Sequence, residues 1–415
     1  MRLNPLSCGI RNVVGAFTFA PKLTASLLAA AGVTLAVVSS LDLWHGGGPS
    51  EPGEVSSSQF HKQGAAAPLP ASFVSGANEE DGAAAYPRAV KTVRFFDPQI
   101  RQERTRSRRS FAANAWLEDM KVPDGSLRLR IPLPGSLQNP AWSPDGSSIV
   151  FTRFRKGYNK GPADLYVFDL TRNVLTPLVA DGTDNVSQPG STWNARTGQI
   201  VFSSDRDGHE ELFVISSQGG QDTARKITSR SSLMALEPSF SPEGGRLVFE
   251  TRVPGEGARG RITMLDLGEM RYQDLTSAQE DCRQPNWSPR GDYILYQKRS
   301  GSRWSIWLYD LANKTHRLAT PAGEGDKTDA TFSPDARYIV YSGEYGDEDG
   351  EYLLAAPLTG GKPFRITRHN GYHGAASWSP DGSYLVQEAS EHSSGRDPAR
   401  TQLILTPVQL KTAMP

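Results

Sequence analysis

A phrase made of an aromatic residue followed by a Ser-Pro-Asp-Gly turn, or a variant of it, recurs six times along the chain. The aromatic residues of successive phrases are 45 to 51 residues apart, and they are Trp142, Trp193, Phe240, Trp287, Phe332 and Trp378. A period of this length accommodates four short strands, as in a propeller blade. Because an isolated unit cannot bury its own sheet face, six units must pack in a ring. The sequence therefore predicts an all-β fold, a six-bladed β-propeller of four-stranded antiparallel blades.

Each unit also contains turn and strand signals in a fixed order. In the phrase, Pro presets φ, Asp or Ser can hydrogen-bond the turn's own backbone, and Gly accepts a positive φ. A short apolar run such as Ile149–Phe151 follows the turn and is typical of a strand. A third strand, for example 164–169, and a fourth, for example 273–276, complete the unit. The Asp of the phrase is therefore expected to be a structural residue first.

The sixth unit has no clear fourth strand, because the chain ends soon after its third predicted strand, which begins at Thr401. Just ahead of the first phrase, Ser126–Pro132 has the pattern and spacing of a fourth strand. We expect this segment to pair with the last blade and close the ring, which leaves fewer exposed sheet edges.

The phrase, the apolar strand after it, the segment Ser203–Gly208 and the Ile-Thr or Leu-Thr pair at the end of a unit resemble the repeat of TolB-type six-bladed propellers. The resemblance covers roughly residues 126–408 and implies the fold rather than an activity, since propellers host many unrelated functions. TolB itself carries an α/β domain ahead of its propeller that docks to membrane partners. Residues 46–125 lack the alternating strand and helix pattern that such a domain needs.

The N-terminal residues 1–45 predict a signal peptide or a signal anchor. Residues 23–41 are nearly continuously apolar, basic residues precede them, and no acidic residue occurs before Asp42. This asymmetry predicts a cytoplasmic N-terminus and a propeller in the periplasm, with residues 23–41 in the inner membrane if they are not cleaved. A mitochondrial presequence is the alternative interpretation. Only Cys282 remains beyond this segment, so no intrachain disulfide is expected in the propeller.

Residues 46–125 are expected to form a flexible linker ahead of the propeller, which is assigned to 126–415. The stretch 46–86 is rich in Gly, Ala, Ser and Pro and has few large apolar side chains. The following stretch 88–109 is strongly basic, which suggests either a solvated linker or a patch for an anionic partner. No nucleic acid is expected as the partner, because no recognition motif or series of stacking aromatic residues is present.

The sequence offers no convincing catalytic set and predicts no cofactor. No Gly-x-Ser-x-Gly elbow occurs, and the chain has no room after the propeller for a hydrolase domain. His369 and His373 flank a Gly-rich loop and are weak candidates for metal binding, but the remaining histidines of the propeller do not converge on them. The segment Asp205–Glu211 lacks the full ligand ladder of a calcium loop, so it is interpreted as a hairpin turn.

The axial channel of the propeller is the predicted binding surface. When the units are aligned at the aromatic residue, amide or carboxylate side chains precede the phrase in five units, namely Asn139, Gln188, Glu237, Gln284 and Asp329. The sixth unit has Ala375 or Ala376 there. Such a ring could receive a peptide strand or a sugar, or it could hydrogen-bond neighbouring blades and channel water.

These observations favour a non-enzymatic scaffold of the bacterial cell envelope that docks a protein or peptide segment on the propeller face or at the channel mouth. The alternative is a carbohydrate- or peptide-processing enzyme with an acidic or metal site in the channel. An enzyme would need convergent titratable groups with shifted pKa values in one pocket, whereas a scaffold needs only a complementary face.

Overall fold

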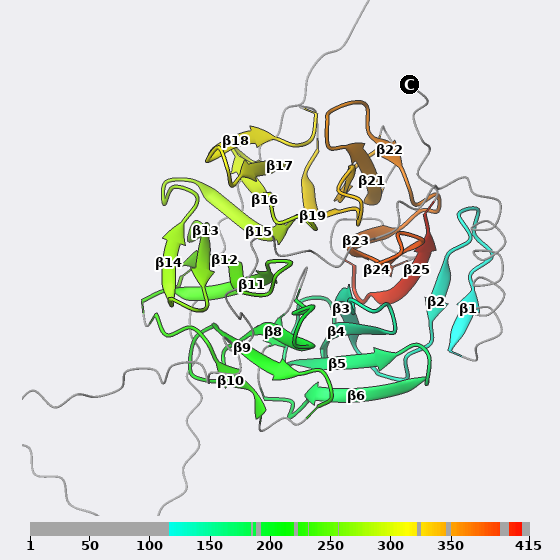
Figure 1. Ribbon diagram of the computed structural model, residues 1–415. Coiled ribbons are helices and arrows are strands. Elements are labelled where there is room, and N and C mark those ends of the chain that lie inside the picture. The colour runs from blue at the N-terminus through cyan, green and yellow to red at the C-terminus, as the bar shows by residue number, and fades with distance from the viewer. Residues whose placement is uncertain are drawn as a thin grey trace, which may run out of the picture. The chain divides into compact units, whose positions relative to one another are not determined.

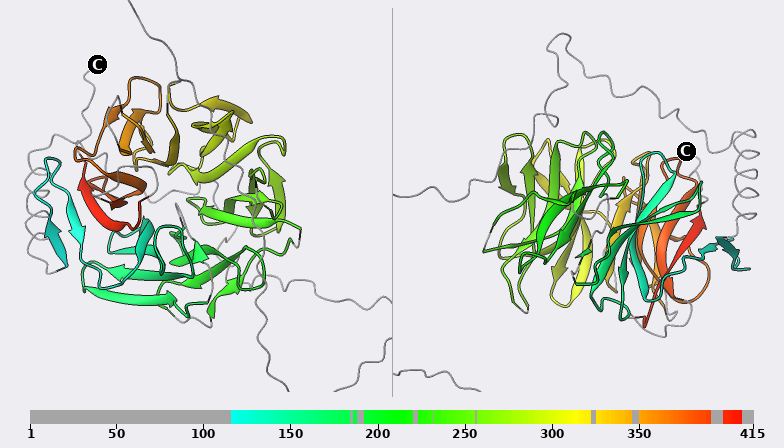
Figure 2. Two further views of the ribbon diagram at one scale, coloured as in Figure 1. Left: turned by 180° about the vertical axis from the view of Figure 1, so that it is seen from behind. Right: turned by 90° about the horizontal axis from the view of Figure 1, so that it is seen from below.

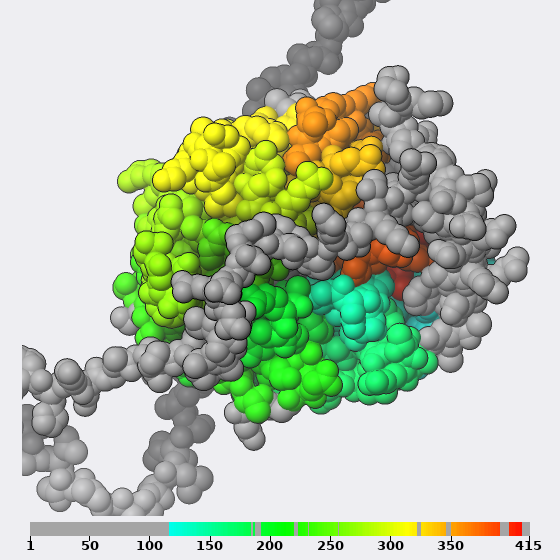
Figure 3. Space-filling model, viewed as in Figure 1, coloured from blue at the N-terminus to red at the C-terminus, as the bar shows by residue number. Residues whose placement is uncertain are grey.

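The computed structural model describes residues 116–408, except 184–185, 188–191, 220–222, 231, 256, 322–324, 346–349 and 391–397. The described residues form six antiparallel sheets arranged in a ring, as Figure 1 and Figure 2 show. The space-filling view shows that the blades succeed one another round the ring in sequence order (Figure 3). The predicted six-bladed β-propeller is confirmed. No helix of the described part is both long and apolar enough to cross a membrane, and residues 23–41 lie outside it.

Five blades have four strands each, in the order of the chain. Blade 1 contains β3 (Ser136–Trp142), β4 (Ser148–Phe154), β5 (Ala163–Asp169) and β6 (Val174–Val179). Blade 2 contains β7 (Val186–Ser187), β8 (Gln199–Ser204), β9 (Glu211–Ser216) and β10 (Arg225–Lys226). Blade 3 contains β11 (Met234–Phe240), β12 (Arg246–Arg252), β13 (Arg261–Asp266) and β14 (Arg271–Asp274).

Blade 4 contains β15 (Asp281–Trp287), β16 (Tyr293–Ser300), β17 (Arg303–Asp310) and β18 (Thr315–Leu318). Blade 5 contains β19 (Lys327–Phe332), β20 (Tyr338–Gly343), β21 (Tyr352–Pro357) and β22 (Phe364–Arg365). Blade 6 is built from both ends of the propeller, from β23 (Tyr372–Trp378), β24 (Tyr384–Ser390) and β25 (Gln402–Pro407), and from β1 (Leu117–Asp119) and β2 (Leu127–Leu129). The first strand of each blade lies nearest the axis (Figure 1).

The N-terminal strand closes the ring, as the sequence predicts. Strand β2 pairs with β25 in antiparallel register, with Leu127 opposite Leu405. Strand β1 then pairs with β2 and adds a fifth strand to this blade. Residues 117–119 fall within the stretch assigned from the sequence to the linker. A three-residue strand with one buried side chain, Leu117, leaves too short a periodic pattern to be recognised.

The turn phrase works through its Asp, Ser and Gly side chains and backbone. In blade 1 the carboxylate of Asp145 accepts hydrogen bonds from the Ser143 hydroxyl at 2.6 Å and from the Ser147 amide at 3.0 Å. Gly146 adopts a φ of 73°, which an L side chain rarely adopts. The hydrogen bond from Ser143 lowers the pKa of Asp145. The expected structural role of this Asp is confirmed.

Apolar clusters fill the spaces between adjacent blades. Val150 and Leu165 of blade 1 pack with Ile200 and Phe202 of blade 2, and all four side chains are completely buried. The same arrangement joins the last blade to the first, because Leu129 and Leu405 pack in one cluster with Phe151. The core is therefore a ring of interfaces, and closure buries the last of them.

We predict that Leu129→Ala destabilises the propeller by about 2–5 kcal/mol, because the substitution leaves a cavity at a side chain that is only 2% exposed. Urea unfolding of the full chain, followed by tryptophan fluorescence, measures the change. The matched control is Leu318→Ala on β18, another outer strand, where the side chain is 38% exposed and the loss should be smaller. Equal losses in the two variants would contradict a stabilising role for the closing strand.

Candidate functional site

A β-bulge in the innermost strand of the blades fixes the predicted channel residues. The strand register shifts at this point in β3, β11, β15, β19 and β23. One residue in each bulge adopts a left-handed conformation with φ between 44° and 53°, and these residues are Asn139, Glu237, Gln284, Asp329 and Ala375. The structure therefore gives four of the predicted residues one equivalent position, with Ala375 as the sixth blade's counterpart. Gln188 lies outside the described residues.

Hydrogen bonds between neighbouring blades use the side chains of these residues. The Gln284 amide N–H donates to Glu237 Oε2 at 2.9 Å, and the Asp329 amide N–H donates to Gln284 Oε1 at 3.3 Å. The Ala375 amide N–H in turn donates to the Asp329 carboxylate. Each side chain thus accepts the bulge N–H of the next blade, which is an interpretation that the sequence had left open beside partner binding.

Glu388 performs this task in blade 6, where Ala375 has no polar side chain. Its Oε2 accepts the Asn139 amide N–H of blade 1 at 2.9 Å, and its Oε1 accepts the Tyr372 hydroxyl at 2.9 Å. The hydroxyl of Tyr158, from the loop after β4, lies 2.7 Å from that of Tyr372. A buried carboxylate therefore joins the last blade to the first.

Glu388 belongs to a second ring of polar side chains that sequence reasoning missed. These residues follow the apolar run of the second strand in every blade, and all are buried: Thr152, Ser203, Glu250, Gln297, Ser342 and Glu388. In five blades they pair with the residue just before the bulge, as Glu250 does with Leu236. Their constant offset from the aromatic phrase is the signal that could have identified them.

The carboxylates of the two rings interact unfavourably with one another. Burial and repulsion from Glu250 and Asp329 raise the pKa of Glu237 well above its usual range. Burial raises the pKa of Glu250 to about 7, although Arg252 opposes this shift. Burial and the nearby Asp329 also raise the pKa of Glu388 to about 7. These groups consequently change charge close to neutral pH.

A hollow at the axis brings three of the predicted residues together. It encloses about 400 Å³, including space open to solvent, and its lining is Glu237, Gln284, Pro285, Asn286, Asp329, Ala330, Thr331, Ala375 and Ala376. This lining contains no Lys, Arg or His side chain. The small side chains of Ala375 and Ala376 contribute to the open space. Carboxylate and amide oxygens at the rim can accept hydrogen bonds from an entering group.

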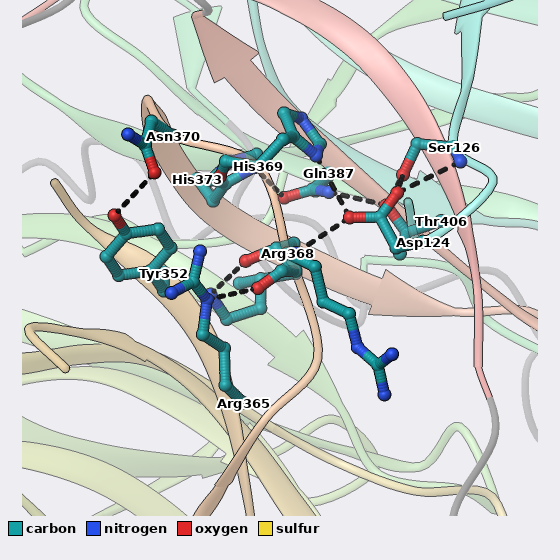
Figure 4. A network of polar contacts seen from close by, with 12 residues as sticks. Asp124, Ser126, Tyr352, Arg365, Arg368, His369, Asn370, His373, Gln387 and Thr406 are labelled. Atoms are coloured by element: carbon teal, nitrogen blue, oxygen red, sulfur yellow. Dashed lines mark hydrogen bonds and ion pairs between the residues drawn. The ribbon is translucent and has the colours of Figure 1, made fainter. Parts of the chain in front are cut away.

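His369 and His373 lie together, but in a network that fastens the closing segment (Figure 4). His369 Nδ1 is 2.9 Å from Asp124 Oδ2, which also accepts the Arg368 amide N–H at 2.7 Å. Burial by itself would raise the pKa of Asp124, but hydrogen bonds from His369, Ser126 and Arg368 hold it well below its usual range.

The second histidine is almost completely buried in the same network. His373 Nδ1 lies 3.1 Å from Gln387 Oε1, and its Nε2 lies 3.2 Å from the carbonyl oxygen of His369. Burial lowers the pKa of His373 to about 4, so the ring is neutral at physiological pH. Within the described part of the chain, no three His, Cys, Asp or Glu side chains gather as a metal-binding group.

Comparisons with known proteins agree with the repeat. The family pattern of the TolB beta propeller domain matches residues 114–324. Two similar curated proteins are the Tol-Pal system proteins TolB of Francisella tularensis subsp. mediasiatica (strain FSC147) and subsp. tularensis (strain SCHU S4 / Schu 4), each 28% identical over 180 residues, or 43% of this chain. The match spans only 39% and 38% of the lengths of these two relatives.

Solved structures with a similar chain trace include both binding proteins and enzymes. TolB from Acinetobacter baumannii is 18% identical, with 66% of this chain and 64% of that chain covered and a TM-score of 0.47. An oligogalacturonate lyase in complex with manganese is 13% identical, with 70% and 95% covered and a TM-score of 0.47.

The raised pKa of Glu388 predicts a pH-dependent stability. The folded protein holds this proton more tightly than the unfolded chain, so the free energy of unfolding falls as pH rises from about 4.5 to about 7. Glu388→Gln keeps an acceptor for the Asn139 N–H and should remove up to about 3 kcal/mol of this fall. Urea unfolding at several pH values measures it.

The control for this experiment is Glu269→Gln, which changes an exposed carboxylate whose side chain is 63% accessible. Its stability profile between pH 4.5 and 7 should match that of the unaltered protein. A Glu388→Gln profile as steep as that of the unaltered protein would show that Glu388 does not titrate in this range.

Proposed function

The chain belongs to the TolB β-propeller family, and from this premise we propose that it is a non-enzymatic protein-binding scaffold of the bacterial cell envelope. The observation that carries the proposal is the hollow at the channel mouth, where Glu237, Gln284 and Asp329 present acceptor groups beside the small Ala375 and Ala376. A partner would insert a peptide segment there. The names of the similar curated proteins, which belong to the Tol-Pal system, support an envelope partner.

A periplasmic location is the second part of the proposal. The basic residues before the apolar stretch 23–41 and the absence of acidic residues until Asp42 support export of the propeller across the inner membrane. The stretch would anchor the protein in that membrane, and residues 46–115 would tether the propeller to it. Family membership supports the same compartment.

An enzyme acting on carbohydrate or peptide is the second candidate, because carboxylates with raised pKa values converge near the hollow. Two observations make it the weaker one. Glu250 and Glu388 are only 1% and 3% exposed, so a substrate would reach them with difficulty. In addition, Glu237 and Asp329 already accept backbone N–H groups of the next blade. Their chemistry is explained by the assembly of the ring.

A crosslinking pull-down of the tagged full-length protein from membranes tests the scaffold. We expect capture of an envelope protein, and we expect the double variant Glu237→Gln and Asp329→Asn to weaken it about tenfold, or ~1.4 kcal/mol. The amide side chains still accept the inter-blade N–H groups, so the ring should stay intact while the charges are removed. Binding of the captured protein to each purified variant gives the affinities.

The control is the double variant Glu243→Gln and Glu269→Gln, whose carboxylates lie beside turn glycines away from the hollow and are partly exposed. It should bind as the unaltered protein does. Capture of no envelope protein, together with hydrolysis or cleavage of a glycan or peptide that Glu237→Gln abolishes, would replace the scaffold with the enzyme.

A further inference from the structure

The proposed function gives no role to the basic segment 88–109. This segment carries eight basic side chains against two acidic ones, a net charge of +6, in a chain whose total charge is balanced. Five of the arginines lie within its last nine residues, namely Arg101, Arg104, Arg106, Arg108 and Arg109. Such a run remains attached to the propeller by a short connection, so any acidic surface within reach meets it at a high effective concentration.

The hollow at the channel mouth is the complementary acidic surface. Glu237 and Asp329 line it, and no cationic side chain does. The two cations that face these groups from neighbouring strands are already engaged, because Arg252 lies 3.4 Å from Glu250 and Arg283 lies 2.9 Å from Asp281. The repulsion among the carboxylates therefore has no further cation from the described lining to relieve it.

The shape of the hollow suits a guanidinium group. Four blades have a long polar side chain at the bulge, whereas blade 6 has Ala375 followed by Ala376. The space next to these alanines is bordered by Asp329. A guanidinium is planar, weakly hydrated and carries five N–H donors, so it can pair with a carboxylate through two hydrogen bonds. An ammonium group would be a poorer match.

The connection between the segment and the propeller is long enough. Strand β1 is the outermost and β23 the innermost strand of blade 6, and four strand spacings separate them by roughly 20 Å. The eight residue steps from Arg109 to Leu117 span up to about 26 Å when extended. Arg101 and Arg104 have still more chain available. The arginines can therefore reach the axis from the edge of the same propeller.

We propose that the basic segment 88–109 docks in cis at the channel mouth, with arginines of residues 101–109 placed against Glu237 and Asp329. A partner inserting into the hollow must then displace the segment. Docking would thus set a threshold for partner binding and exclude weak, nonspecific ligands from the mouth. This regulatory meaning rests on the proposed function, whereas the intramolecular contact does not.

Site-specific photo-crosslinking in the full-length protein tests the contact. A photoreactive phenylalanine analogue replaces Thr105, and mass spectrometry identifies the peptides joined to it. We expect peptides that contain 284–286, 329–331 or 375–376. The yield should fall about fivefold or more in the double variant Glu237→Gln and Asp329→Asn, and again when salt is raised from about 0.05 M to about 0.5 M.

Three controls separate the contact from chance encounters. The same analogue at Ser57, in the uncharged part of the linker, should give no such peptides. The double variant Glu243→Gln and Glu269→Gln should leave the yield from position 105 unchanged. A mixture of isotope-labelled and unlabelled protein distinguishes crosslinks within one chain from those between chains. Equal yields from positions 57 and 105, no effect of the charge-neutralising variant, or crosslinks only between chains would overturn the proposal.

The regulatory part has its own readout. Replacing the five arginines of residues 101–109 with glutamine should increase binding of the captured partner several-fold, because no segment has to be displaced. Unchanged binding would show that docking does not regulate the site. If no variant captures a partner while the crosslink within one chain persists, the scaffold function fails and the intramolecular contact stands.

Discussion

The assembly of the ring depends on finding an acceptor for one backbone N–H group per blade. The innermost strand has a free edge toward the axis, and the bulge with its left-handed residue turns the amide of that residue toward the neighbouring blade. A side chain of the preceding blade then accepts it, as Glu237 does for Gln284. Apolar packing brings the blades together, but these directed bonds fix their relative positions. The channel must therefore be lined with oxygen atoms for structural reasons.

This requirement produces the electrostatic character of the mouth. Where the acceptor is a carboxylate, charge accumulates near the axis, and burial keeps the counter-charges few. Glu237 and Asp329 repel each other, and Glu250 adds to the effect from the strand behind. The raised pKa values are a consequence of this crowding and do not by themselves indicate catalysis. The same crowding makes the mouth attractive to a cation, so a structural device becomes a surface that a partner or a segment of the same chain can use.

Closure of the ring links the mouth to the rest of the chain. Blade 6 takes three strands from the C-terminal part and two from the N-terminal part, so the residues that precede the propeller begin at its edge. Asp124 fastens this junction through Arg368, His369 and Ser126, and Glu388 fastens it near the axis through Asn139. The two histidines that the sequence marked as metal candidates are explained as parts of the fastening.

The sequence by itself determined the fold, the number of blades and the closing strand, because each is encoded in a local pattern that repeats with constant phase. Trp142 and its five counterparts set the period, and residues 126–132 supply the missing strand. It also placed Glu237, Gln284 and Asp329 at one level of the channel. Only the tertiary structure decided what these side chains do, since their partners lie 45 to 47 residues away on the next blade. The roles of Glu388 and Asp124 depend on contacts between the two ends of the propeller, 249 and 245 residues apart in the chain. No local pattern records such contacts, because they exist only once the ring has closed.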